Sequence, residues 1–372
     1  MRSRLSFAAL VLAMALLGPA YTWAAASAAE IRVGSSAALS GQAAGLGLRF
    51  HAGAAAYFAQ LNHQGGIGGA RVVVDLLDDA YESDRADTNS RKLVEDERVL
   101  ALFGYVGTPT SNMALPYVRR WKIPFVGAYT GAEMLREPYN PLVFNVRASY
   151  KEEAQQLAVA MKAAGVRTLN VFYQADLFGR AGLEAMRAAA AAAGIRILTT
   201  ATVKRNTAAV DAEAASLTQS TPADAIYLVS TYATTAAFVR SARAKGFGGR
   251  FYTLSFAGLE QLRQALGKAQ FKGLTIAQVV PDAEDRSLPI VAEYQQAMRD
   301  AGDRHFDSIS LEGYLAARVL AEGLRRARHP LSRESLEQGL EAIGSLDLGG
   351  YRVHFGPGLR NGSSLVELRA QP

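Results

Sequence analysis

Two hydroxyl-bearing segments of the chain could bind a ligand anion, and Thr108 marks the first. Thr108 precedes Pro109, and a helix is expected to run on to about Trp121. Threonine is a good N-cap, and proline suits the first helical position because its missing N–H would be unpaired anyway. A helix start also presents free N–H groups and positive partial charge, which favour a carboxylate. Thr108 therefore has two compatible interpretations, a cap on its own helix and an anion ligand.

Tyr129 and Thr130 mark the second segment. They follow a short expected strand, residues 124–126, and precede Gly131. Open α/β sheets bind ligands just outside the carboxyl ends of their strands. A ligand loop is therefore one interpretation of this segment, and an ordinary surface turn is the other.

The residue patterns of common enzyme sites are missing from the sequence. Gly45-Leu46-Gly47 begins like a dinucleotide-binding loop, but Phe50 stands where a third glycine is needed. There is no phosphate-loop motif and no nucleophile elbow, and the absence of cysteine excludes thiol catalysis and disulfides. The five histidines are scattered, without zinc-site spacing: His51, His63, His305, His329 and His354. We expect no catalytic residue, no metal and no cofactor.

Short apolar strands alternate with helical stretches along the first half of the chain. The expected strands are residues 31–34, 72–77, 100–103 and 124–126. Helices are expected from about Leu48 to Asn62, from Ser83 or Asp84, and from Thr108 to Trp121. This alternation indicates βαβ units and a parallel sheet covered on both faces.

A second series of the same kind begins after residues 144–147. Its expected strands are residues 169–172, 195–200, 225–229, 251–254 and 274–277. The alanine run before Gly194 reads as a helix with a glycine terminator. Three helices follow, near 287–301, 308–327 and 332–343, and the tail segments 351–355 and 365–368 read as two antiparallel strands around Gly356-Pro357-Gly358.

The N-terminus has the pattern of a secretory signal. Basic residues in 1–4 precede an apolar run, residues 5–17, and small residues follow, with a cleavage site near Ala28 or Ala29. The run is shorter than the roughly 20 residues that span a membrane, and no cysteine follows it for lipid attachment. A soluble, exported, periplasmic protein that is not lipidated is expected; an uncleaved anchor is the alternative.

Composition fits this expectation. Hydrophobic residues make up 49% of the 372, which is enough to form the cores of two domains. The formal charge of +6 falls to +4 without Arg2 and Arg4, and acidic and basic residues alternate. Such a mild excess does not argue for nucleic acid as a partner.

A series of motifs in a fixed order resembles the leucine/isoleucine/valine-binding-protein-like periplasmic receptors. Each piece alone is weak, but together they span the chain after the signal. The matching pieces are Leu39-Ser40-Gly41, Gly53-Ala54, Leu61-Asn62, Gly65-Gly66-Ile67, Leu76-Leu77-Asp78-Asp79, Phe103 to Thr108, Ile123 to Val126, Asp176-Leu177-Phe178-Gly179 and Leu311-Glu312-Gly313-Tyr314.

The resemblance implies an α/β fold of two doubly wound parallel-sheet lobes joined by three crossovers, the type I periplasmic binding protein fold. A ligand would lie in the cleft between the lobes. After a signal peptide at 1–28, lobe 1 would comprise 30–147 plus 281–349, and lobe 2 would comprise 148–280 plus 350–372. The crossovers would lie near Val146-Arg147, between Ala277 and Pro281, and near Gly349-Gly350.

The resemblance also implies which residues contact the ligand. Thr108 and Thr130 would offer hydroxyls, Tyr129 would narrow the pocket, and Phe178 would close over the ligand from the second lobe. The remaining implied positions are Leu46, Tyr232, Ser255 and Phe256.

The sequence departs from the resembled pattern at Ser255-Phe256. Amino-acid binders of this family often carry a glutamate in this loop as the counter-ion for the ligand ammonium. Burying an ammonium without a counter-charge is costly. Either Asp176 or Glu312 substitutes, or the ligand has no ammonium, and we favour the second interpretation.

These observations favour an exported solute-binding receptor of an ABC importer, not an enzyme, for a small carboxylate-bearing apolar or aromatic ligand, an amino acid or its deaminated acid. Its expected partners are that small molecule and a membrane permease, with no nucleic acid, and a monomer is expected. One alternative is a ligand sensor of the same fold that feeds a membrane kinase or another regulator. A disfavoured alternative is an exported enzyme.

Overall fold

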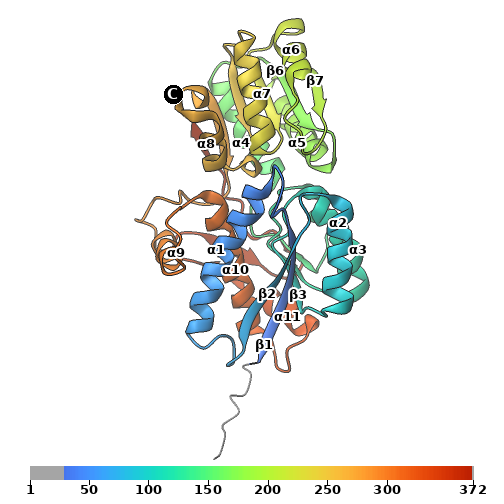
Figure 1. The fold of residues 1–372 in the computed structure, drawn as a ribbon, viewed down its shortest axis with the longest axis vertical. Helices are drawn as coiled ribbons and strands as arrows, with labels where there is room; N and C mark the ends of the chain where they lie inside the picture. Colours follow the sequence, from blue (N-terminus) through green and yellow to red (C-terminus); the bar gives the residue numbers. More distant parts are fainter. Residues whose placement is uncertain (1–28, 371–372) are drawn as a thin grey trace, which may run out of the picture.

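The computed structural model describes residues 29–370 and contains two lobes stacked along the long axis of the molecule (Figure 1). The predicted signal peptide at 1–28 lies outside the described residues. The first lobe is built around a five-stranded sheet and the second lobe around a six-stranded sheet. Within the described part of the chain, no helix is long and apolar enough to cross a membrane.

The first lobe contains a five-stranded parallel sheet in the order β2-β1-β3-β4-β5. Its strands are β1 (Glu30–Ala37), β2 (Arg71–Asp78), β3 (Ala101–Phe103), β4 (Phe125–Val126) and β5 (Val143–Phe144). Six helices belong to this lobe: α1 (Ala44–His63), α2 (Ser83–Arg91), α3 (Thr108–Trp121), α9 (Pro289–Asp300), α10 (Ser308–Arg326) and α11 (Arg333–Glu341). In Figure 1, α2 and α3 lie on the opposite side of the sheet from α1 and α10.

The second lobe contains a six-stranded sheet in the order β13-β10-β9-β8-β6-β7. Its parallel strands are β6 (Thr168–Gln174), β7 (Arg196–Val203), β8 (Ala225–Val229), β9 (Arg250–Thr253) and β10 (Leu274–Gln278). Every residue of the inner strand β8 is buried, whereas burial alternates along the edge strand β7. A fully apolar central strand and a half-buried edge strand are typical of a sheet covered on both faces.

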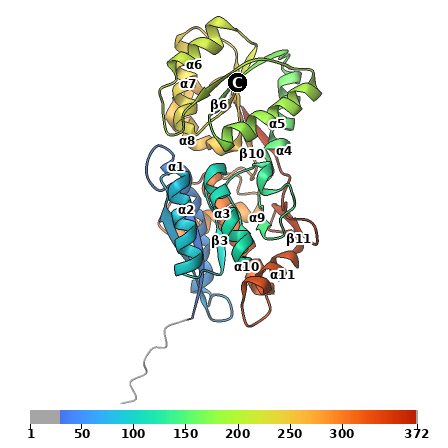
Figure 2. The same cartoon turned by 90° about the vertical axis from the view of Figure 1, so that its right-hand side faces the viewer.

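The described helices of the second lobe lie around its sheet (Figure 2). They are α4 (Tyr150–Ala163), α5 (Leu177–Ala193), α6 (Asp211–Ala215), α7 (Tyr232–Ala244) and α8 (Leu259–Phe271). The alanine run is helical in α5, and Gly194 ends this helix with a positive φ of 74°, as predicted. The predicted strands from 31 to 277 and the three later helices are likewise present.

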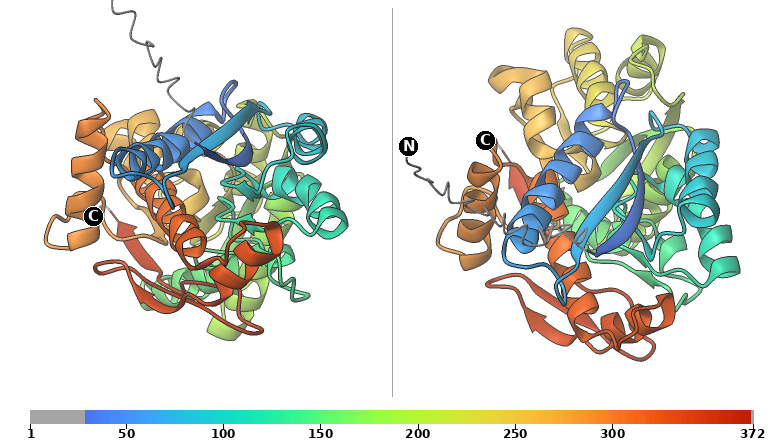
Figure 3. Two further views of the ribbon diagram at one scale, coloured as in Figure 1. Left: turned by 90° about the horizontal axis from the view of Figure 1, so that it is seen from below. Right: turned by 60° about the horizontal axis from the view of Figure 1, so that its bottom comes forward.

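Helices α1 and α10 cross at close range, side by side in Figure 3. A β-carbon placed on Gly53 of α1 would lie 1.7 Å from the Ser310 carbonyl oxygen, and one on Gly313 would lie 1.9 Å from the Phe50 carbonyl oxygen. The two glycines therefore allow backbone contact between the helices. This contact fixes the start of α10, which carries Glu312.

The predicted pairing of the two tail strands is wrong. Strand β12 (Arg352–Phe355) pairs with β11 (Gly344–Asp347), and β13 (Glu367–Ala370) joins the edge of the second sheet, antiparallel to β10. Alternating burial identifies a strand but not its partner. The chain therefore remains beside the first lobe past Gly349-Gly350, and we propose that the third crossover lies between β12 and β13. The other lobe boundaries remain predictions.

Candidate functional site

The two predicted hydroxyl segments meet at the carboxyl ends of β3 and β4. The hydroxyl oxygens of Thr108 and Thr130 are 2.7 Å apart, and the Thr130 hydroxyl donates to the Tyr150 hydroxyl at 3.1 Å. All three residues are fully buried. Parallel strands end at the same edge of a sheet, so segments 22 residues apart in sequence come together there.

Thr108 does not cap its helix, which corrects the capping interpretation. The N-cap position of α3 is Gly107, with φ of 106°, and Thr108 is the first helical residue. No side-chain cap bond is made at this helix start, because Gly107 has no side chain, and the Thr108 hydroxyl contacts Thr130. The Thr108 hydroxyl is therefore part of the buried contact with Thr130.

Aromatic rings from both lobes pack in a row that reaches Tyr150, the hydrogen-bond partner of Thr130. The Phe256 ring, in a short 3-10 turn after β9, lies 5.3 Å from the Tyr129 ring and 4.4 Å from the Phe178 ring, between centroids. The Phe178 ring in turn lies 5.7 Å from the Tyr150 ring. Tyr129 comes from the first lobe, whereas Phe178 and Phe256 come from the second. These three predicted residues form one buried aromatic cluster between the lobes.

An ion cluster that was not predicted lies next to Ser255. Arg147 follows β5, is almost completely buried, and lies 3.3 Å from Glu153 and 3.5 Å from Glu312. The Glu153 carboxylate accepts hydrogen bonds from the Ser255 N–H at 2.7 Å and the Ser255 hydroxyl at 2.9 Å, and Arg147 also donates to that hydroxyl. The arginine side chain covers the Tyr129 ring at 4.9 Å. The Ser255 loop therefore contacts an acid after all, supplied by α4.

The two acids of this cluster differ in how well they are paired. Glu153 has hydrogen bonds from Ser255 and Arg147, whereas Glu312 contacts Arg147 only at 3.5 Å. Burial raises the pKa of Glu312 to about 7, although the charge of Arg147 partly opposes this. Near neutral pH, Glu312 is therefore present in both its protonated and its ionised form, so a bound ligand can shift its charge.

Asp176, the other predicted counter-ion, binds groups outside the Arg147 cluster. It caps α5 by accepting hydrogen bonds from the N–H groups of Phe178 at 2.9 Å and Gly179 at 3.1 Å, and it pairs with Arg205 at 3.2 Å. Its negative charge is thus already balanced. Its role as an ammonium counter-ion remains an untested prediction, and Glu312 is the better placed of the two predicted acids.

Leu46 and Tyr232 lie where the first turn of α1 approaches the second lobe. The Gly45 N–H donates to the Tyr232 hydroxyl at 3.3 Å, and the neighbouring Leu46 is completely buried. Tyr232 therefore joins the second lobe to the start of α1. Contact of either with a ligand remains a prediction.

Sequence reasoning missed Arg147, Glu153, Tyr150 and Tyr81. Three of these had a visible signal. Arg147 is a lone basic residue at the predicted crossover, and Tyr150 and Glu153 follow Ser149, which caps α4 in a capping box with Glu152. A helix that starts directly after a crossover necessarily begins near the cleft.

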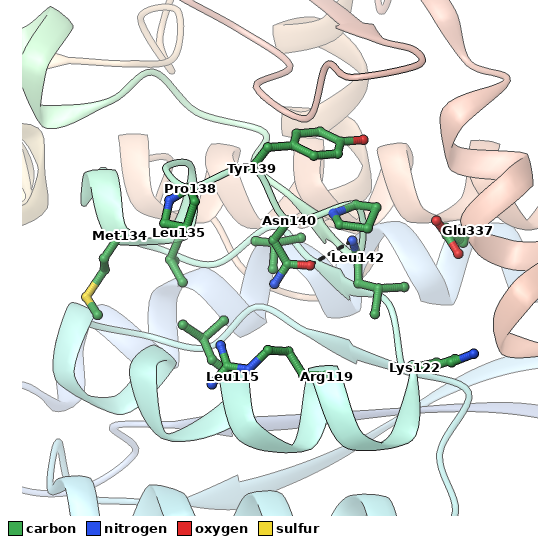
Figure 4. A pocket seen from close by; sticks show the side chains of 12 residues that line it. Leu115, Arg119, Lys122, Met134, Leu135, Pro138, Tyr139, Asn140, Leu142 and Glu337 are labelled. Carbon is green, nitrogen blue, oxygen red and sulfur yellow. Dashed lines mark hydrogen bonds between the residues drawn. The ribbon is translucent and has the colours of Figure 1, made fainter.

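A separate cavity of about 470 Å³ lies on the first lobe, away from these residues (Figure 4). Its wall combines Leu115 and Arg119 of α3 with the loop from Met134 to Val143. The loop is shaped by Asn140, whose side-chain oxygen accepts a hydrogen bond from the Leu142 N–H at 3.1 Å. No predicted site residue lines this cavity.

Two parallel-sheet lobes that meet over a buried, partly polar centre define a bilobal ligand-binding receptor. The chain belongs to the periplasmic binding protein family, whose model matches residues 30–362. This confirms the resemblance drawn from the motifs. The family consists of solute-binding receptors, and membership implies a periplasmic or extracellular location.

Solved structures agree with this assignment. A possible leucine/isoleucine/valine-binding protein from Rhodopirellula baltica is 33% identical with a TM-score of 0.86, over 92% of this chain and 94% of that one. A substrate-binding periplasmic protein from Ralstonia solanacearum is 31% identical with a TM-score of 0.85, over 91% and 96%. An extracellular ligand-binding receptor from Verminephrobacter eiseniae is 28% identical with a TM-score of 0.81, over 91% and 97%. No curated protein matches the chain.

Proposed function

We propose that this protein is an exported solute-binding receptor of an ABC importer. Its ligand is a small carboxylate-bearing molecule with an apolar or aromatic group, either an amino acid or a deaminated acid. The observation that carries this proposal is the buried pair of hydroxyls of Thr108 and Thr130 at the start of α3, linked through Tyr150 to a row of aromatic rings from both lobes.

The ligand carboxylate would accept hydrogen bonds from these two hydroxyls and face the N-terminus of α3. Hydrogen bonds to an ionised group are the stronger kind, and a helix start adds favourable partial charge. The rings of Tyr129, Phe178 and Phe256 would pack on the apolar part of the ligand. Because these rings come from both lobes, ligand binding would favour the closed arrangement, which the membrane permease then recognises.

The first lobe contains a serine–histidine contact, but this contact does not support an enzymatic function. Ser35 Oγ lies 3.0 Å from His51 Nε2, but both residues are buried in the core, and His51 also contacts the Gly104 carbonyl at 3.2 Å. Burial lowers the pKa of His51 to about 4, so the ring is a neutral, packed group. We therefore propose a binding role without catalysis.

We further propose that the protein acts as a monomer in the periplasm, after cleavage near Ala29 and without lipid. A receptor that feeds a membrane kinase or another regulator would use the same cleft. The genes next to this one distinguish the two roles, since an importer requires permease and ATPase subunits.

Mass spectrometry of small molecules released from the purified, denatured protein tests the ligand class. The expected result is a small carboxylic acid with an apolar or aromatic group. The same acid, added to refolded protein, should raise the melting temperature according to RT ln(1 + [L]/Kd). Release of a sugar or another molecule without a carboxylate would contradict the proposal.

A further inference from the structure

Tyr81, just after the carboxyl end of β2, has an unusual backbone conformation. Ala80 and Tyr81 both have positive φ angles, 50° and 64°. This conformation is costly for a bulky residue and is found where the surrounding structure enforces it, often at functional sites. Here two aspartates enforce it: the Ala80 N–H donates to Asp78 and the Tyr81 N–H donates to Asp79, each at 2.8 Å.

The enforced turn directs the Tyr81 side chain to the start of α3. A β-carbon on Gly107 would lie 2.5 Å from Cε2 of the Tyr81 ring, so the ring packs directly on the residue before Thr108. On its other side, the Tyr81 ring lies 6.2 Å from the Phe256 ring of the second lobe. The ring therefore lies between the hydroxyl pair's helix and the aromatic cluster.

The Tyr81 hydroxyl is completely buried beside the Gln174 side chain and makes no hydrogen bond of normal geometry among the described residues. Burial, together with the nearby charge of Asp176, raises the pKa of Tyr81 well above its ordinary value, so the group stays protonated. A buried hydroxyl without a partner costs free energy that a bound molecule with a suitable acceptor recovers.

The second lobe holds Tyr81 in this position. Arg205, after β7, donates to the Tyr81 carbonyl at 2.9 Å and to the Ser83 hydroxyl at 3.2 Å, and it covers the Tyr81 ring at 5.6 Å. Asn206 donates to the Ala80 carbonyl at 3.3 Å. The contacts from Arg205 and Asn206 therefore fix the position of Tyr81 when the two lobes are in contact.

We propose that the Tyr81 hydroxyl donates a hydrogen bond to an oxygen beside the ligand carboxylate, so that the site selects 2-oxo or 2-hydroxy acids over acids without that oxygen. This inference rests on the function proposed above. The ring packs on Gly107, the residue before Thr108, and this proximity links the tyrosine to the proposed carboxylate site. An ammonium in that place would need a counter-charge, and Asp176 is already engaged by Arg205 and the α5 N–H groups.

Phenylpyruvate and 3-phenylpropanoate test this inference, because they share a carboxylate and a phenyl ring and differ by the 2-oxo oxygen. In calorimetry, the wild type should bind phenylpyruvate about tenfold more tightly, the effect of one hydrogen bond. Tyr81→Phe should reduce this preference to within about twofold. Tyr105→Phe is the matched control: Tyr105 is also buried in the first lobe, but its hydroxyl is paired with Ser90 at 3.0 Å, so the preference should persist.

Melting of the ligand-free proteins gives a second readout. Tyr81→Phe removes an unpaired hydroxyl and should leave the melting temperature unchanged or raise it, whereas Tyr105→Phe breaks a hydrogen bond and should lower it. Equal binding of both acids by the wild type, or an unchanged preference in Tyr81→Phe, would overturn the inference and leave the proposed function intact. If no carboxylate binds the wild type, the proposed function fails together with the inference.

Discussion

The Ser255 N–H donates a 2.7 Å hydrogen bond to the Glu153 carboxylate, across 102 residues of sequence. The loop that carries Ser255 has no acid of its own, yet this contact gives it one. Because Arg147 pairs with the same carboxylate at 3.3 Å, the charge of Glu153 is balanced within the protein. Glu153 is therefore a structural partner of the loop, and Glu312 is the acid whose removal we expect to report on the charge of the ligand.

Glu312→Gln should distinguish the two ligand classes. We expect a deaminated acid to stabilise the wild type more than the matching amino acid, because an unpaired buried ammonium is costly. Glu312→Gln should then keep or increase affinity for the deaminated acid. A thermal-shift series with phenylpyruvate and phenylalanine at equal concentration ranks the affinities.

Glu293→Gln is the control, since Glu293 is exposed and pairs with Arg318 on the surface. A clear preference of the wild type for phenylalanine, lost in Glu312→Gln but kept in Glu293→Gln, would show that Glu312 is an ammonium counter-ion.

Thr108→Ala should weaken binding of a carboxylate ligand by about 1–2 kcal/mol, because one hydrogen bond to a charged group is lost. The unfolding free energy should fall by only about 1 kcal/mol, the value of the broken contact with Thr130, since no helix cap is removed. Calorimetry and urea denaturation measure the two effects separately.

Thr110→Ala is the matched control on the same helical turn. Its hydroxyl donates to the carbonyls of Val106 and Gly107, so stability should fall while affinity stays the same. Equal affinity of Thr108→Ala and wild type would show that Thr108 has no part in ligand binding.

The contribution of Glu312 to stability without ligand should decrease as the pH rises from about 4.5 to 7. The folded protein holds the Glu312 proton to a pKa of about 7, compared with an ordinary value of 4.5, so it binds more protons than the unfolded chain in this range. The stabilising contribution of the Glu312 proton is fully present below pH 4.5, the ordinary pKa. It is lost as the pH rises through about 7, the pKa of Glu312 in the folded protein. At 1.36 kcal/mol per unit, the contribution is about 3 kcal/mol.

Glu312→Gln should flatten this pH dependence. The remaining dependence should be weak, because Asp79, whose pKa burial raises to about 6, lowers stability as the pH rises, whereas His51, whose pKa burial lowers to about 4, raises it. Melting temperatures of both proteins at pH 5 and pH 8 measure the difference, and parallel curves for wild type and variant would contradict the assignment.

Gly53→Ala should destabilise the protein by about 1–3 kcal/mol or more, because the new methyl group would collide with the Ser310 backbone of α10. Gly248→Ala, with open space around the added carbon, should change stability by less than about 0.5 kcal/mol. Urea denaturation compares the two variants, and equal stabilities would show that α1 and α10 separate at little cost.

The sequence predicted the elements that depend on local pattern. The fully apolar run in β8 and the helix that ends at Gly194 follow from hydrophobicity and from the conformational freedom of glycine. The meeting of Thr108 and Thr130 was not predicted, although both segments come after neighbouring strands of one parallel sheet.

The remaining features depend on contacts that local pattern does not encode. The contact between Glu153 and Ser255 depends on the packing of α4 beside β10. The pairing of β13 with β10 joins two segments that are far apart in the sequence. The positive φ of Tyr81 depends on two aspartates that hold its turn. The sequence contains all these residues, but their partners are set by tertiary packing.

Calorimetry with a carboxylic acid and its carboxamide tests the central claim most directly. The claim is that the hydroxyls of Thr108 and Thr130 at the start of α3 bind a carboxylate. Phenylpyruvate and 3-phenylpropanoate, each compared with its own carboxamide, differ only in the group placed at this site. The account predicts measurable binding of at least one acid and binding of its amide at least about tenfold weaker, because the charge-assisted hydrogen bonds are lost. Binding of an amide as tight as that of its acid would contradict it.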